Sequence, residues 1–156
     1  MLAAIRPDDW NYALFLHVLG AMLLVGGLAT ALAAEALAWR ATTPGSVLAY
    51  ARIGFRALLL VALPGWILMR IGGQWIASKE GFDGGGDPAW LGIGYVTSEG
   101  GGVLLLVATV LAGLGARRLR RTAGEGSTLT RVAGVLAALL VLTYVVTVWA
   151  MTTKPG

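Results

Sequence analysis

The chain has 156 residues, of which 57% are hydrophobic, and its mean hydropathy of +0.76 excludes an ordinary soluble domain. The formal net charge is +4 at pH 7, and because the basic residues lie beside apolar stretches, we assign this charge to the membrane surface and predict no binding of nucleic acid. Cysteine is absent and histidine occurs once, which excludes disulfides, thiolate chemistry and a cage of several histidines within one chain.

The first predicted helix covers residues 10–39. A helix across a hydrocarbon core of about 30 Å needs about 20 apolar residues, and this one would be about 45 Å long. Asp8 and Asp9 outweigh Arg6 where a signal peptide would be basic, so we predict a retained membrane helix. Small residues favour close packing of this helix, within the chain or between two copies: Gly20, Gly26, Gly27, Ala31, Ala34 and Ala38.

The second predicted helix covers residues 53–71 and is interrupted near its middle by Leu63-Pro64-Gly65. Proline removes a backbone donor and its ring clashes with the carbonyl of Leu60, so we predict a kink there. Two roles are open for this kink: it would fit the second helix to its neighbours, or it would open a cavity. Residues 72–87 follow as the only long non-helical stretch, with several glycines beside three acids. We predict a solvated loop, with a calcium site or a substrate lid as the alternative.

The third predicted helix covers residues 88–119, with Asp87 as its N-cap and Pro88 at its first position. An unbroken helix from 88 to 121 would be about 51 Å long, which is more than a span requires. Three consecutive glycines offer an interruption. We therefore predict a break at 100–102, with an interfacial or tilted segment before it and the true span after it.

The fourth predicted helix covers residues 129–151 and is capped by Ser127 or Thr128. In a chain of four helices the first and third connections lie on one side. Eight of the twelve basic residues are found there: Arg40, Arg52, Arg56, Arg117, Arg118, Arg120, Arg121 and Arg131. We predict an all-α, polytopic four-helix transmembrane bundle, a single domain over 1–156. The positive-inside rule places both termini outside and the arginine-rich loops in the cytoplasm of a bacterial inner membrane.

Polar side chains at membrane depth are candidates for function, because burial in lipid is costly for them. His17 lies about 12 Å from the centre of its helix, in the outer leaflet. Tyr144 and Thr147 lie about 6 and 10 Å from the centre of theirs. We predict one outer polar cavity formed by these three residues and Glu99. His17 would be an interhelical hydrogen-bonding residue, a ligand of a cofactor or metal, or a relay, and Thr147 would alternatively bond the carbonyl four residues earlier.

Glu35 lies about 15 Å inward of the centre of the first helix, at the inner edge of the hydrocarbon core. Several arginines of the same end are within reach of a side chain at that depth. We predict an interfacial ion pair between Glu35 and one of them: Arg40, Arg52, Arg56 or Arg117.

Two segments of the chain resemble parts of known families. The run Leu16-His17-Val18-Leu19-Gly20, followed by Gly26-Gly27, resembles an uncharacterised family of predicted four-helix bacterial integral membrane proteins, as does the tail from Trp149 to Gly156. A looser similarity extends to copper-resistance-D-type proteins and to membrane-bound, haem-dependent protoporphyrinogen oxidases. In these oxidases a histidine of the first helix is a haem ligand, and the resemblance implies that role for His17. The second ligand of a haem b would then be one of these: Met22, Met69, Met151, Lys154 or the His17 of a second copy.

The chain contains no hydrolase or metalloprotease motif such as Gly-x-Ser-x-Gly or His-Glu-x-x-His, so an enzyme is not the favoured class. We predict a non-enzymatic helix bundle in the lipid bilayer, either a homo-oligomer or an accessory subunit of a larger membrane partner. Its outer polar cavity would take a small solute, an ion or a lipid. The alternative is a membrane redox protein that binds haem b through His17.

Overall fold

The computed structural model describes residues 9–81, 89–122 and 128–153, and nearly all of them are helical. In chain order the elements are α1 (Asp9–Arg40), α2 (Pro44–Ala57), the π-helical η1 (Leu58–Ala62), α3 (Leu63–Glu80), α4 (Ala89–Arg121) and α5 (Thr128–Thr153). Because α2, η1 and α3 are continuous, the described chain has four helical segments, and each is long and apolar enough to cross a membrane. By helix length and hydropathy, the chain is an all-α, multi-pass membrane protein.

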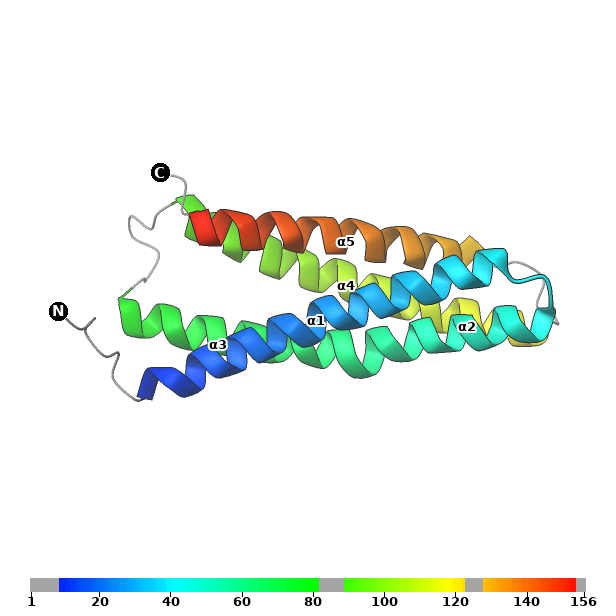
Figure 1. The fold of residues 1–156 in the computed structure, drawn as a ribbon, viewed down its shortest axis with the longest axis horizontal. Helices are drawn as coiled ribbons and strands as arrows, with labels where there is room; N and C mark the ends of the chain where they lie inside the picture. Colours follow the sequence, from blue (N-terminus) through cyan, green and yellow to red (C-terminus); the bar gives the residue numbers. More distant parts are fainter. Residues whose placement is uncertain (1–8, 82–88, 123–127, 154–156) are drawn as a thin grey trace.

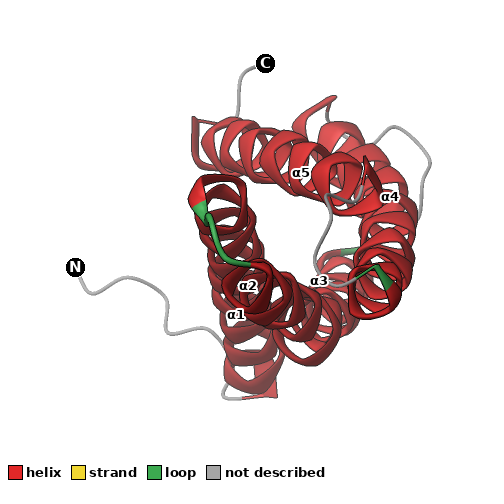
Figure 2. Ribbon diagram, turned by 90° about the vertical axis from the view of Figure 1, so that its right-hand side faces the viewer, coloured by secondary structure: helices red, strands yellow, loops and turns green. Residues whose placement is uncertain are grey.

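The four segments form an elongated bundle (Figures 1 and 2). The start of α1, the end of α3, the start of α4 and the end of α5 lie together at what we call the terminal end (Figure 1). We call the opposite end arginine-rich, because the exposed arginines of α1, α2, α4 and α5 gather there. Large apolar side chains such as Leu60, Met22 and Val96 are exposed along the outer surface, as contact with lipid requires.

The backbones of α1 and α3 are in contact, because glycines occupy both sides of their interface. A Cβ atom added to Gly65 would lie 2.5 Å from the nitrogen of Leu24, and one added to Gly27 would lie 2.6 Å from a backbone nitrogen of η1. Gly20 faces the same interface. Such small residues let membrane helices approach closely. Gly20 and Gly27 therefore serve packing within the chain, whereas Gly26 is exposed, with open space around it.

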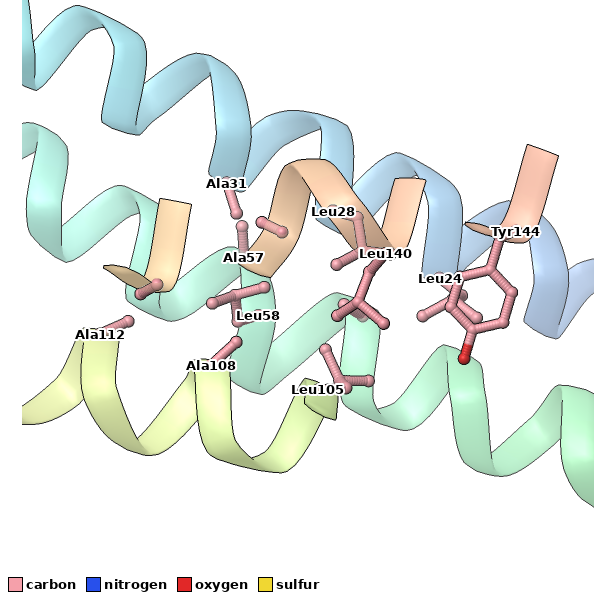
Figure 3. Close-up of a cluster of buried hydrophobic side chains, with 13 residues drawn as sticks. Leu24, Leu28, Ala31, Ala57, Leu58, Leu105, Ala108, Ala112, Leu140 and Tyr144 are labelled. Atoms are coloured by element: carbon pink, nitrogen blue, oxygen red, sulfur yellow. The ribbon is translucent and has the colours of Figure 1, made fainter. Parts of the chain in front are cut away.

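Leucines and alanines from all four segments fill the middle of the bundle (Figure 3). The fully buried leucines of this cluster, which we call the leucine core, are Leu24, Leu28, Leu58, Leu105 and Leu140. Lipid tails are as apolar as leucine, so this core stabilises the bundle through close van der Waals packing and not through removal from water.

The second helical segment is longer at both ends than the predicted range 53–71. It starts at Pro44, and it continues through residues predicted as a loop to Glu80. The disturbance expected at Pro64 takes the form of the π-helical turn η1, which ends two residues before the proline and contains Leu60, whose carbonyl the proline cannot bond. Gly81 ends the segment in a left-handed conformation, with φ of 76°. The rest of the predicted loop, with Asp87 and Pro88, lies outside the described residues.

The predicted break at 100–102 is wrong, because α4 runs unbroken over 33 residues, about 50 Å of helix. The glycines there make room for side chains of neighbouring helices. A Cβ atom on Gly101 would clash with the hydroxyl of Tyr144, and one on Gly102 would clash with the indole of Trp66. A helix tolerates glycine where packing compensates for its weak propensity.

Candidate functional site

A cavity of about 120 Å³ lies between α1, α3, α4 and α5, on the terminal side of the leucine core. We call it the terminal cavity. Much of its wall is aliphatic, with residues such as Leu24, Val25 and Val148. The polar part of the wall comes from all four segments: His17, Arg70, Tyr95, Thr97, Ser98, Tyr144 and Thr147.

His17 joins α1 to α3 at this wall. Its Nδ1 nitrogen lies 2.9 Å from the carbonyl oxygen of Met69. Since a carbonyl only accepts, Nδ1 carries a proton, and in the neutral ring Nε2 then has a lone pair. Two glycines of α3 make this contact possible: a Cβ on Gly72 would lie 2.5 Å from the His17 nitrogen, and one on Gly73 would lie 3.0 Å from Nδ1. The predicted interhelical hydrogen bond of His17 is confirmed.

Two hydroxyl groups in the wall have no hydrogen-bond partner within the described residues. They belong to Tyr144, which is 4% exposed, and Ser98, which is 9% exposed. The Tyr144 hydroxyl is directed away from α5 (Figure 3) and lies against Gly101 of α4. Buried polar groups are almost always paired, so two unpartnered hydroxyls on residues of one wall make this cavity the candidate site. Ser98 is a cavity residue that the sequence analysis missed, although it is the immediate neighbour of Glu99.

Thr147 lies in the cavity wall, but its hydroxyl donates to the carbonyl of Thr143 at 2.8 Å. Thr143 in turn donates to the carbonyl of Leu139, also at 2.8 Å. The predicted bond from Thr147 to the carbonyl four residues earlier is therefore confirmed. Thr147 retains only acceptor capacity toward the cavity.

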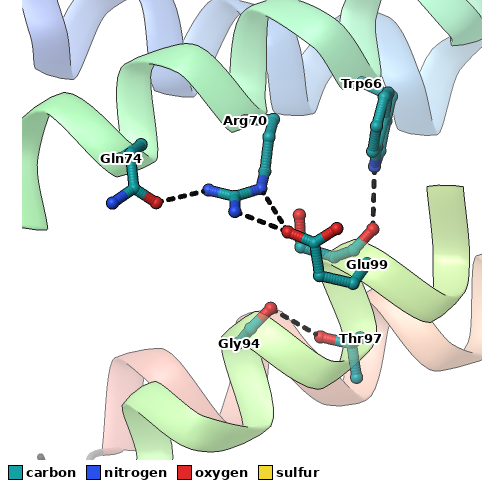
Figure 4. A network of polar contacts seen from close by, with 7 residues as sticks. Trp66, Arg70, Gln74, Gly94, Thr97 and Glu99 are labelled. Atoms are coloured by element: carbon teal, nitrogen blue, oxygen red, sulfur yellow. Dashed lines mark hydrogen bonds and ion pairs between the residues drawn. The ribbon is translucent and has the colours of Figure 1, made fainter. Parts of the chain in front are cut away.

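Glu99 is not part of the cavity wall. It is largely exposed, and its carboxylate accepts from Nε of Arg70 at 2.8 Å and from a terminal nitrogen of the same guanidinium (Figure 4). Arg70 also donates to Gln74 and lies 5.6 Å from the ring centre of Tyr95. The structure thus brings His17, Tyr144 and Thr147 to one cavity and places Arg70 there in place of Glu99.

A second link closes the bundle between α3 and α4. The indole nitrogen of Trp66 donates to the carbonyl of Ser98 at 2.9 Å (Figure 4). The indole ring lies against Gly102. Trp66 and Arg70 are one turn apart on α3. Together they hold α4 against α3 beside the terminal cavity, and they position the Ser98 hydroxyl in its wall.

Among the described residues, those around His17 do not fit a haem within one chain. Met69 lies next to His17 across a backbone contact of α1 with α3, which leaves no space for a macrocycle between them. Met22 is exposed on the outer surface, and the side chains of Met151 and Lys154 lie outside the described part of the chain. The volume of about 120 Å³ is also below the range of roughly 300–1,000 Å³ that is usual for larger ligands.

The predicted ion pair of Glu35 is wrong. Glu35 is only 3% exposed, and neither carboxylate oxygen has a hydrogen-bond partner among the residues that the structure describes. The four candidate partners, Arg40, Arg52, Arg56 and Arg117, are all exposed. Long cationic side chains near helix ends reach toward water, so the carboxyl group has no arginine partner in the described part of the chain.

No protein-family model, no curated protein and no solved structure matches this chain. These comparisons therefore identify no family that would support the resemblance seen around His17 and in the tail. The fold and the hydropathy define the class to which the chain belongs, a small four-helix protein of a lipid bilayer.

Proposed function

We propose that this protein binds one small uncharged molecule in the terminal cavity and is a non-enzymatic membrane subunit. The observation that carries the proposal is the pair of unpartnered, buried hydroxyls of Ser98 and Tyr144 in the wall of one cavity. His17, whose Nε2 is left as an acceptor, belongs to the same wall. These groups suit a ligand that has an apolar body and one hydroxyl or carbonyl group, because such a ligand satisfies the hydroxyls while it fills the aliphatic part.

Volume and charge narrow the ligand class. An engineered apolar cavity of about 150 Å³ binds benzene, so a cavity of about 120 Å³ takes a molecule of similar size or the end of a longer one. The guanidinium of Arg70 in the wall disfavours a cation. The described residues also contain no group of three side chains that would hold a metal ion. Of the three ligand classes considered, a small solute, an ion and a lipid, the first fits best, as a small neutral amphiphile.

Phenol and benzene are matched probes for this proposal, since they differ only in the hydroxyl group. We expect phenol to raise the unfolding temperature of the protein in nanodiscs more than benzene does. A ligand at about one hundred times its Kd stabilises by about 2.7 kcal/mol. In Tyr144→Phe the advantage of phenol should shrink, because the hydroxyl is lost and the ring is kept. Thr143→Val, on an exposed face of α5, is the control.

Three outcomes would overturn the proposal. One is equal stabilisation by the two probes, and the second is an undiminished advantage of phenol in Tyr144→Phe. The third is the absence of any effect, which would mean that water alone satisfies the two hydroxyls.

The subunit role rests on a face of α1 that the bundle leaves open. Gly26, Ala29 and Ala33 are exposed there, at spacings that allow a second helix to approach. Because the sequence contains no cysteine, single introduced cysteines report contacts cleanly. We expect Gly26→Cys to form a disulfide-linked dimer in the membrane and Val96→Cys, exposed on α4, to remain a monomer. The same yield of dimer from both variants would show random collision.

The proposed orientation puts the arginine-rich end in the cytoplasm of a bacterial inner membrane, following the positive-inside rule. Thr43, between α1 and α2, and Ser78, near the end of α3, are exposed at opposite ends of the bundle. In intact cells, a membrane-impermeant maleimide should label Ser78→Cys and spare Thr43→Cys until the cells are opened. The reverse pattern would invert the proposed topology.

The absorption spectrum tests the alternative, a haem held by His17. Since the surrounding residues do not fit a haem within one chain, we expect no Soret band from protein made in haem-replete cells. A Soret band that shifts on reduction and is lost in His17→Ala would replace our proposal with a haem-binding function that needs a second copy.

A further inference from the structure

Glu35 is a buried acid that the terminal cavity does not use. It lies on α1, 18 residues after His17, which corresponds to about 27 Å along the helix, and the leucine core lies between the two. Its side chain is 3% exposed, and both carboxyl oxygens lack a hydrogen-bond partner within the described residues. An unpaired carboxylate in a membrane interior is costly and marks a functional site by default.

Glycines of two neighbouring helices form the space around this carboxyl group. A Cβ added to Gly54 of α2 would lie 3.5 Å from Oε1 of Glu35. One added to Gly134 of α5 would lie 3.2 Å from the Glu35 Cβ and 3.3 Å from its Cγ. The contacts at Gly134 are tighter than usual, so the absence of a side chain there lets α5 lie against the acid, while a Cβ on Gly54 of α2 would be in ordinary contact with it.

The charged groups on the surrounding helices do not neutralise Glu35. On its own helix Arg40 is exposed, and the candidates on the elements packed against it are exposed or half-buried. These are Tyr50, Arg52 and Arg56 of α2, Arg117 of α4 and Arg131 of α5. The structure shows no ion pair or hydrogen bond from any of them to Glu35 within the described ranges.

We propose that Glu35 is a proton-binding site of this protein, which holds one proton as the neutral acid and exchanges it with water at the arginine-rich end. In the exchange, hydronium gives a proton to one carboxylate oxygen and leaves water behind. A proton suits the site better than a sodium ion, because a metal ion needs several oxygen ligands and a proton needs one. Glu35 is five residues from the end of α1, about 8 Å along the helix, so the arginine-rich end is the nearer aqueous side.

An apolar carbodiimide tests this proposal on the whole protein in nanodiscs. The neutral acid gives its proton to a carbodiimide nitrogen while the carboxyl oxygen attacks the central carbon, and the adduct rearranges to a stable acylurea that mass spectrometry locates. We expect one adduct, at Glu35. Above the pH at which Glu35 loses its proton, labelling should fall about tenfold per pH unit, because only the protonated form reacts. The control Glu99→Gln, which removes an exposed carboxylate, should label like the wild type.

The variant Glu35→Gln distinguishes a proton-binding role of Glu35 from a purely structural one. Glutamine imitates the neutral acid in size, so this variant should fold, keep the phenol response of the terminal cavity and lose labelling at this position. Its infrared spectrum should also lack the carbonyl band of a protonated carboxylic acid that the wild type shows near neutral pH. Failure of the phenol response alone would refute the proposed ligand and leave the proton site standing.

The proton site is overturned by any of three results. The first is an absence of adduct at Glu35 over the whole pH range in which the protein folds. The second is an infrared spectrum in which the carboxyl band is already that of a carboxylate near neutral pH. The third is protection of Glu35 from the reagent by sodium ions at constant pH, which would make it a sodium site.

Discussion

Replacing Gly65 by alanine tests the backbone contact between α1 and α3 directly. The new Cβ would lie 2.5 Å from the Leu24 nitrogen, 2.8 Å from the Leu23 Cβ and 2.9 Å from the Gly20 oxygen. Carbon contacts are most favourable at about 3.5–4.0 Å. Two of these three neighbours are backbone atoms, which cannot rotate away. The helices must therefore separate by about 1 Å at this point.

The expected loss of stability follows from that separation. A gap of about 0.5–1 Å removes a quarter to a half of the attraction of each atom pair, and each pair contributes about 0.1–0.2 kcal/mol. If about 40 atom pairs cross the interface near Gly65, the loss is about 1–4 kcal/mol, in line with about 1–3 kcal/mol for overpacked cores. We expect about 2 kcal/mol, and we expect the hydrogen bond from His17 to Met69 to lengthen, because it bridges the same two helices.

Unfolding by sodium dodecyl sulfate, followed by far-ultraviolet circular dichroism, measures the effect. Gly100→Ala is the matched control: it lies inside a helix, as Gly65 does, but no atom is within 4 Å of its added Cβ. It should be neutral or stabilising by up to about 1 kcal/mol, because alanine favours helix. The double variant Gly20→Ala/Gly65→Ala should lose less than the sum of the single changes, since one separation relieves both clashes. Equal stabilities of Gly65→Ala and Gly100→Ala would refute the backbone contact between α1 and α3.

The same unfolding assay checks three further predictions. Trp66→Phe removes the donor to the Ser98 carbonyl and should cost about 0.5–1.5 kcal/mol; a neutral result would contradict the link between α3 and α4. Gly101→Ala should cost about 1–3 kcal/mol, because the added Cβ clashes with the buried hydroxyl of Tyr144. Gly100→Ala, whose added Cβ meets open space, should be neutral. Equal effects of the two changes would disprove the clash. Glu99→Gln should cost less than about 1 kcal/mol, because its ion pair is largely exposed; a greater loss would mean that the pair holds the bundle together.

Hydropathy and the rise of the helix were sufficient to predict the number of helices and part of the terminal cavity. Both depend on distances along a single helix, which the sequence determines. His17, Tyr144 and Thr147 were assigned to one depth from the rise of about 1.5 Å per residue, and all three line the cavity. Whether they form a binding site stays a prediction, which the probes above address.

The failed predictions concern contacts between helices. The glycines at 100–102 suggested a break because glycine is a weak helix former, but their neighbours, Trp66 and Tyr144, lie far away in the sequence. Glu99 was assigned to the cavity by depth alone, whereas the direction of its side chain and the length of α3 pair it with Arg70. The ion pair of Glu35 was predicted from the length of the arginine side chains near the same depth. Their exposure at the surface, which the sequence does not show, was not taken into account.

The leucine core has a consequence for the permeability of this protein. Cavities and seams lined only by leucine and alanine stay dry, so the fully buried leucines of α1, η1, α4 and α5 interrupt any file of water between the two ends of the bundle. A molecule bound in the terminal cavity, as proposed, would be separated from the arginine-rich end by this core, and a proton on Glu35 would have no aqueous path to His17 through the described residues. The described residues thus place a dry apolar layer across the middle of the bundle, and coupling between the two proposed sites would require a movement of helices.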